Sequence, residues 1–120
     1  MLQVVFWGTR GSSAPFASSL EFGCHTTAVE VRGDRGDPVF VDLGTGIAPA
    51  AVAALDRGVR QFTVLLTHLH LDHVCGTCAF EPLFRRDCAI TIFSEHAGTR
   101  EALRQVLTPP LFPVKYDGFG

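Results

Sequence analysis

A short apolar run that ends in a cluster of histidines restricts the fold more than any other feature. Residues 62–66 (Phe-Thr-Val-Leu-Leu) are almost continuously apolar, which is typical of a strand buried on both faces of a sheet. The next seven residues are Thr67, His68, Leu69, His70, Leu71, Asp72 and His73. Ligands of open α/β sheets bind beyond the carboxyl ends of the strands, so this position favours a functional site. We therefore predict an α/β fold with its site at the end of this strand.

The rest of the sequence predicts further strands and helices on either side of this run. Strands are expected at 2–7, 26–31, 38–42 and 89–93, and helices at 47–57, 75–84 and 94–107. Turn-forming residues at 32–37 join two of the strands into a hairpin. Pro49 in the first turn and Gly58 after the end support the first helix, while Ser94 is the expected N-cap of the last.

Length and composition exclude several classes of protein. A chain of 120 residues with 47% hydrophobic content builds one hydrophobic core. The formal net charge of −2 provides no long-range attraction to nucleic acid or to an anionic membrane. No apolar stretch approaches the roughly 18 residues of a membrane span, and the first residues lack a positively charged leader. We therefore expect a cytoplasmic protein whose four cysteines remain thiols or metal ligands.

The histidine cluster offers four candidate metal ligands: His68, His70, Asp72 and His73. Imidazole and carboxylate are donors that zinc favours. Side chains alternate along extended backbone, so His68 and His70 project to one side and can share a metal. His73 is out of phase with them, so the chain must turn before Asp72 and His73 can face a second metal. The alternative is an exposed polar loop whose histidines cap nearby backbone groups.

Three segments together resemble the metallo-β-lactamase superfamily. They are Thr-His-Leu-His-Leu-Asp-His at 67–73, Asp-Leu-Gly-Thr-Gly at 42–46 and Gly-Thr-Arg-Gly-Ser at 8–12. They are similar to the phosphodiesterase-like branch, related to ribonuclease Z and the phosphoribosyl cyclic phosphodiesterases, more than to the true β-lactamases. The resemblance implies the N-terminal half of an αββα sandwich, a mixed sheet with helices packed on one face. Residues 1–120 would then form a single partial domain whose C-terminal half is absent.

The resemblance also implies a role for each residue of the cluster. His68 and His70 would bind the first of two divalent metal ions, and Asp72 and His73 the second. Zinc is the expected metal, with manganese or iron also suited to these donors. Asp42 would steady the ligand loop by orienting a metal-binding imidazole, although a polar residue that closes a strand before a glycine turn is an equally good interpretation. We assign the catalytic role to Asp72.

The implied function is a metal-dependent hydrolase that acts on a phosphodiester, such as a cyclic phosphate or an RNA-like or nucleotide-like molecule. In a complete site, two metals would hold the hydroxide that attacks the substrate. The superfamily completes this site with a further His, a bridging Asp and a last His, for which 1–120 contains no counterpart. We therefore expect a truncated fragment of an enzyme, weakly active or inactive by itself.

Two other expectations follow from an incomplete fold. A half-sandwich would expose a sheet face that its twin normally covers, so we expect self-association. The alternative function is a non-catalytic metal-binding or interaction module that needs a partner chain.

The remaining candidates receive simpler interpretations. Cys75 and Cys78 form a C-x-x-C pair, interpreted as small buried residues under the metal loop rather than as redox thiols or a zinc knuckle. His25 stands where the resembled branch often has Asn, which leaves a substrate-positioning role open. His96, near a helix start, is expected to be exposed or to neighbour the cap. The tail at 111–120 is expected to be a connector that needs something to pack against.

Overall fold

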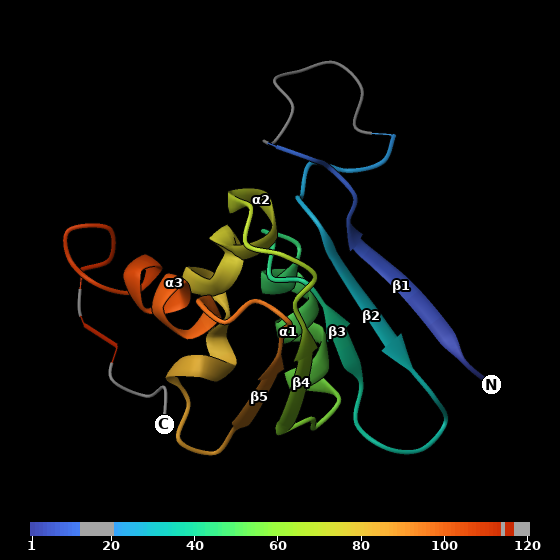
Figure 1. The fold of residues 1–120 in the computed structure, drawn as a ribbon. Coiled ribbons are helices and arrows are strands. Elements are labelled where there is room, and N and C mark those ends of the chain that lie inside the picture. The colour runs from blue at the N-terminus through green and yellow to red at the C-terminus, as the bar shows by residue number, and fades with distance from the viewer. Residues whose placement is uncertain (13–20, 114, 117–120) are drawn as a thin grey trace.

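The computed structural model describes residues 1–12, 21–113, 115 and 116. Within these residues the chain is an α/β protein with one mixed sheet of five strands (Figure 1). The strands are β1 (Gln3–Gly8), β2 (Ala28–Arg32), β3 (Val39–Val41), β4 (Gln61–Leu65) and β5 (Ala89–Phe93). The α-helices are α1 (Ile47–Asp56), α2 (Leu71–Val74) and α3 (Thr99–Val106), and the 3₁₀ helices are η1 (Cys75–Ala79) and η2 (Glu81–Phe84).

The strands lie in the order in which they occur in the chain. β1 pairs with β2 and β2 with β3 in antiparallel fashion, which confirms the predicted hairpin, whereas β3–β4 and β4–β5 are parallel. Parallel strands place their carboxyl ends at one edge of a sheet. Asp42, the histidine loop and Ser94 therefore follow the ends of three neighbouring strands at the same edge.

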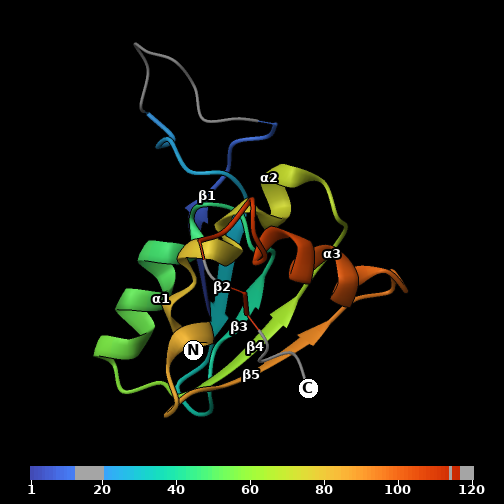
Figure 2. The same ribbon diagram turned by 90° about the vertical axis from the view of Figure 1, so that its left-hand side faces the viewer.

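The hydrophobic core lies between one face of the sheet and the helices (Figure 2). Phe62 on β4 contacts the rings of Phe40 at 5.7 Å and Phe80 at 5.6 Å between centroids. From α1, the fully buried residues are Ile47, Ala50, Ala51 and Ala54. The small alanine side chains let this helix lie close to the strands, so the alanine-rich composition serves packing as well as helix propensity.

The prediction that β4 is buried on both faces was wrong. Phe62 and Val64 are buried, but Leu65 is 43% exposed, because the helices cover only one face. The strand register places a continuous set of uncharged residues on the other face, here called the open face. It consists of Val4, Phe6, Val29, Val31, Val39, Val41, Gln61, Thr63, Leu65, Ala89, Thr91 and Phe93.

The helix predicted at 75–84 is instead two 3₁₀ helices that follow the short α2. Phe80 separates them with a backbone conformation that is not helical (φ −80°, ψ 85°). Pro82, two residues later, has no amide hydrogen to continue a helical hydrogen-bond ladder. The chain can therefore change direction twice beneath the site.

The helix predicted at 94–107 begins later, at Thr99. The Ser94 hydroxyl accepts a hydrogen bond from the His96 amide at 3.2 Å and another from Thr99 Oγ1 at 2.8 Å. These bonds stabilise a turn in place of the first helical turn, so Ser94 is not the N-cap and Glu95 lies outside the helix. The predicted helix at 47–57 is confirmed as α1, and Gly58 follows it with φ +87°.

In the described part of the tail, Phe112 and Tyr116 pack against their own chain. The Tyr116 amide donates to the Leu107 carbonyl at 3.1 Å, and the rings of Phe112 and Tyr116 each lie 5.8 Å from that of Phe84. Phe119 and the part of the N-terminal loop at 13–20 lie outside the described residues. Among the described helices, none has the length and apolar composition required to cross a bilayer.

Candidate metal centre

Asp42 is a buried residue whose side chain forms hydrogen bonds with the histidine loop. It follows β3, is only 2% exposed and has a left-handed backbone conformation (φ +64°). Non-glycine residues adopt this conformation uncommonly, and it recurs at functional sites. The Asp42 carboxylate accepts hydrogen bonds from the Thr67 amide at 2.8 Å, the Thr67 hydroxyl at 2.9 Å and His73 Nδ1 at 2.8 Å. One buried carboxylate thus holds both ends of the ligand loop.

The predicted turn within the loop is confirmed by α2. His70 has extended backbone and precedes the helix, and the His73 amide donates to the His70 carbonyl at 2.9 Å. The Leu43 amide donates to the His73 carbonyl at 2.8 Å, which fastens this turn to the segment after β3. A Cβ on Gly44 would lie 2.5 Å from the Asp72 carbonyl oxygen, so only glycine allows this close approach.

The fold brings all four predicted ligands together. The His68 ring centroid lies 4.4 Å from that of His70 and 4.1 Å from that of His73. His73 Nε2 lies 3.4 Å from Asp72 Oδ2. Three imidazoles and a carboxylate therefore lie close to one another after the end of β4.

Ser12, to which the sequence assigned no role in the site, also contacts the cluster. The Ser12 amide, sixty positions before Asp72, donates to Asp72 Oδ2 at 2.8 Å. This hydrogen bond lowers the pKa of Asp72 below its ordinary value, and the charges of His73 and His70 add smaller effects in the same direction. Asp72 is therefore ionised at neutral pH. The glycine-rich segment at 8–11 was the one signal that this loop comes close to an anionic group.

The hydrogen-bond network also assigns the protons on two imidazoles. A carboxylate only accepts, so His73 Nδ1 carries the hydrogen that Asp42 binds, and Nε2 is the nitrogen that faces Asp72. The Thr67 hydroxyl donates to Asp42, so its oxygen accepts from His68 Nδ1 at 3.0 Å. In each ring the hydrogen bond thus holds Nδ1 and leaves Nε2 outside this network. A neutral imidazole with its proton on Nδ1 is the tautomer whose Nε2 binds metal.

The donor set fits a divalent metal in chemistry and, for one pair, in distance. Two ligands that are each about 2.1 Å from a tetrahedral ion lie roughly 3.4 Å apart, and His73 Nε2 and Asp72 Oδ2 have this separation at 3.4 Å. Across residues 1–12, 21–113, 115 and 116, no three His, Cys, Asp or Glu side chains are arranged to hold a metal ion. His68 and His70 therefore do not join this pair around one ion.

The other two histidines take different positions. His25 Nδ1 lies 3.2 Å from the Thr45 hydroxyl, which also accepts from the Thr26 amide at 2.9 Å, so His25 is tied to the segment after β3. His96 is exposed, as predicted, and its Nδ1 accepts from the Gly98 amide at 3.1 Å.

The sequence predicted that Cys75 and Cys78 would both be buried, and this prediction was wrong. Cys75 is half-buried, but Cys78 is exposed, and its thiol donates to the Cys75 carbonyl at 3.1 Å. Residues three apart in a 3₁₀ helix lie on the same side, which places both cysteines on one side of η1. Gly76 and Thr77 are the residues that η1 buries.

Comparisons with protein-family models, with curated proteins and with solved structures found no match for this chain. The resemblance to the metallo-β-lactamase superfamily therefore depends on the motifs alone and stays a prediction. The α/β architecture is observed, whereas the half-sandwich and the partial domain are interpretations of it.

Proposed function

We propose that this chain carries the metal-binding loop of a metal-dependent hydrolase that acts on phosphodiesters and resembles the metallo-β-lactamase superfamily. The observation that supports this most is the arrangement around Asp42. One buried carboxylate orients His73 directly and His68 through Thr67. A histidine that merely caps backbone has no need of such a partner, whereas metal-binding imidazoles are generally oriented in this way.

Each ligand of the proposed site has a defined task. His68 and His70 would hold one divalent ion, and Asp72 and His73 a second, with zinc, manganese or iron compatible with these donors. When bound, such ions lower the pKa of water and polarise a phosphoryl oxygen. Asp72, whose carboxylate accepts a hydrogen bond from the Ser12 amide, is the proposed catalytic carboxylate.

The number of donors limits what this chain does by itself. Catalytic zinc sites commonly use three protein ligands for each ion, and the proposed site supplies two. We therefore propose that the chain alone turns over substrate weakly or not at all, and that a further segment or chain supplies the missing donors. A non-catalytic metal-binding or interaction module that needs a partner chain is the second candidate.

Zinc binding tests the proposal directly. We expect the chain to compete with a chromophoric chelator for zinc, and His68→Ala or His73→Ala to weaken zinc binding by at least about tenfold. His96→Ala is the matched control, because His96 is exposed and contacts the turn before α3 rather than the cluster. Equal zinc affinity in all four proteins would refute the site.

Cleavage of bis(p-nitrophenyl) phosphate by the zinc-loaded protein then separates the two candidate functions. Cleavage that falls in the His73→Ala variant supports the hydrolase. If the chain binds zinc without cleavage even when a further segment or chain supplies the missing donors, the second candidate is correct.

We further propose that the open face packs against a second copy of the chain. Phe6 is 68% exposed and Phe93 57% exposed on this face, and none of its residues is charged. Two uncharged sheet faces can pack at the usual separation of about 10 Å without repulsion between like charges. The open face therefore suits a face-to-face dimer.

Sedimentation velocity tests this association. We expect dimer formation that increases with concentration, and a shift to monomer in Phe6→Ser/Phe93→Ser. Phe22→Ser is the control, because Phe22 is 67% exposed but lies outside the open face. A monomeric unmodified chain at high concentration would contradict the proposal.

A further inference from the structure

β5 is the last strand of the sheet, and its outer edge pairs with no strand in the described part of the chain (Figure 1). The Ala89 amide donates to the carbonyl just before β4 at 2.9 Å, and the Phe93 carbonyl accepts from the amide just after β4 at 2.8 Å. Backbone groups of successive strand residues point to opposite sides, so those of Ile90 and Ile92 point away from β4. Across residues 1–12, 21–113, 115 and 116, no hydrogen bond reaches these outward groups.

β5 also lacks the features that usually protect an edge strand. Edge strands commonly carry charged residues, proline or a bulge, which hinder another chain from adding to them. The β5 sequence, Ala-Ile-Thr-Ile-Phe, contains neither charge nor proline, and its pairing with β4 is uninterrupted. β1, at the other edge of the sheet, has a register shift between Phe6 and Gly8. The β5 edge is therefore better suited to take up a further strand.

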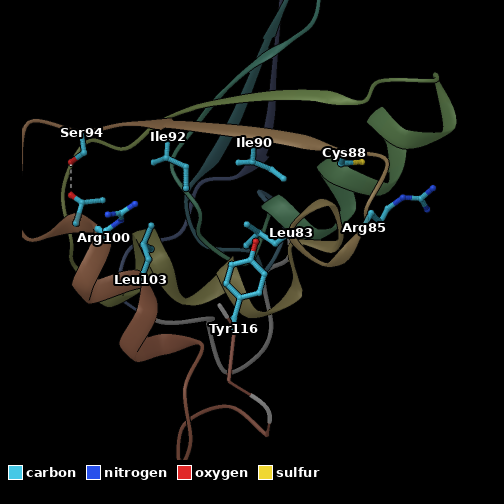
Figure 3. A pocket seen from close by; sticks show the side chains of 10 residues that line it. Leu83, Arg85, Cys88, Ile90, Ile92, Ser94, Arg100, Leu103 and Tyr116 are labelled. Atoms are coloured by element: carbon cyan, nitrogen blue, oxygen red, sulfur yellow. Dashed lines mark hydrogen bonds between the residues drawn. The ribbon is translucent and has the colours of Figure 1, made fainter. Parts of the chain in front are cut away.

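A cavity lies beside the β5 edge, between β5, η2, α3 and the tail (Figure 3). Its volume is about 450 Å³, within the range of about 300–1,000 Å³ that is usual for ligand sites. Ile90 and Ile92 form one side of its middle part and Leu83 and Leu103 lie opposite, whereas polar side chains lie toward its ends (Figure 3). The two residues with outward backbone groups thus also line the cavity.

We propose that the β5 edge and this cavity bind an extended, uncharged peptide segment of a partner protein, which adds to the sheet as an antiparallel strand. In an antiparallel pair, residues directly opposite each other project to the same face, and alternate pairs exchange two hydrogen bonds. The peptide residues bonded to Ile90 and Ile92 therefore place their side chains over the middle of the cavity, where aliphatic groups fit. The segment is uncharged, because β5 offers no charge for it to match. Main-chain hydrogen bonds and alternate side-chain pockets are the general basis of this mode of recognition.

A separate peptide fits this groove better than a second copy of the chain. In a second copy, the β5 side chains of the same face, Ile90 and Ile92, already line that copy's own cavity and are not available to enter another. The side chains of a free peptide have no such prior contacts. The face-to-face dimer uses the side chains of the open face instead, and neither the β5 edge nor the cavity includes a residue of the histidine loop.

Amide hydrogen exchange, followed by NMR with EDTA present, tests this proposal. In the free chain, the Ile90 and Ile92 amides should exchange at least about tenfold faster than the Thr91 amide, because only Thr91 points toward β4. The probe is the peptide Ac-Thr-Ile-Thr-Ile-Thr-NH2. We expect it to slow exchange at Ile90 and Ile92 by at least about fivefold, since binding reduces the fraction of free edge. Exchange at Thr91 should not change, which reports that the sheet remains folded.

Modified peptides test how the strand is placed. Methylation of both isoleucine amides of the peptide removes the donors that face β5, and protection of Ile90 and Ile92 should be lost. Methylation of the amides of the two threonines that follow an isoleucine is the matched control, because these amides face away from β5, and protection should persist. Replacing both isoleucines of the peptide with alanine should raise the concentration for half-protection by about tenfold, because less apolar surface is buried in the cavity.

Slow exchange of Ile90 and Ile92 in the free chain at low concentration would mean that the edge is already covered and would overturn the proposal. Absence of protection by the probe, or equal protection by the two methylated peptides, would do the same. Protection that rises with the concentration of the chain alone would assign the edge to a second copy instead. His73→Ala should be protected like the unmodified chain, which keeps this test independent of the metal site.

Discussion

Replacing Glu30 with alanine is expected to lower the free energy of unfolding by about 3 kcal/mol. The Glu30 side chain on β2 is completely buried and forms ion pairs with Arg57 and Arg32. It also accepts a hydrogen bond from Trp7 Nε1 at 2.9 Å. Removal of the carboxylate leaves the indole N–H without this acceptor. The two arginines are only partly buried and regain water, which keeps the loss at the lower end of the range for buried ion pairs.

Urea unfolding measures this loss. Glu30→Gln should lose less stability than Glu30→Ala, since the amide oxygen can still accept from Trp7. Glu95→Ala serves as control, because Glu95 is exposed and outside the helix, and surface substitutions usually change stability by less than about 0.5 kcal/mol. If Glu30→Ala unfolds at the same urea concentration as Glu95→Ala, the buried ion pairs contribute no stability.

Replacing Asp42 with asparagine should weaken zinc binding by about 10- to 100-fold. Asparagine has the shape of aspartate but only one accepting oxygen, whereas Asp42 accepts from both Thr67 and His73. An amide nitrogen facing His73 Nδ1–H would place two donors together. A proton shift to Nε2 would relieve this contact and would remove the electron pair that binds metal.

Competition for zinc and the nitrogen chemical shifts of the histidine rings check this prediction. The chemical shifts report which ring nitrogen carries the proton, which a purely structural effect of Asp42 would leave unchanged. Thr67→Val should alter His68 alone, because its hydroxyl links Asp42 to His68 Nδ1. Asp37→Asn, at an exposed position before β3, is the control. Unchanged tautomers and zinc affinity in Asp42→Asn would contradict the role assigned to this carboxylate.

Local signals predicted most of the secondary structure. Pro49 in the first turn and Gly58 after the end mark α1, and the apolar residues of β5 identify that strand. The errors occurred where local hydrogen bonds and backbone constraints compete with α-helix formation. The hydroxyl of Ser94 stabilises a turn before α3, and the segment after α2 forms two 3₁₀ helices.

The sequence by itself determined which donors gather at the site, because His68, His70, Asp72 and His73 occur within six positions after one strand. Only the tertiary structure decided which atoms of these donors are held by hydrogen bonds, and by which partners. Asp42 contacts His73 across 31 positions and Ser12 contacts Asp72 across 60. Such contacts depend on how strands and loops meet in space, which no local periodicity encodes. The open face has the same explanation. Helices that are distant from β4 in the sequence decide which side of this strand is covered.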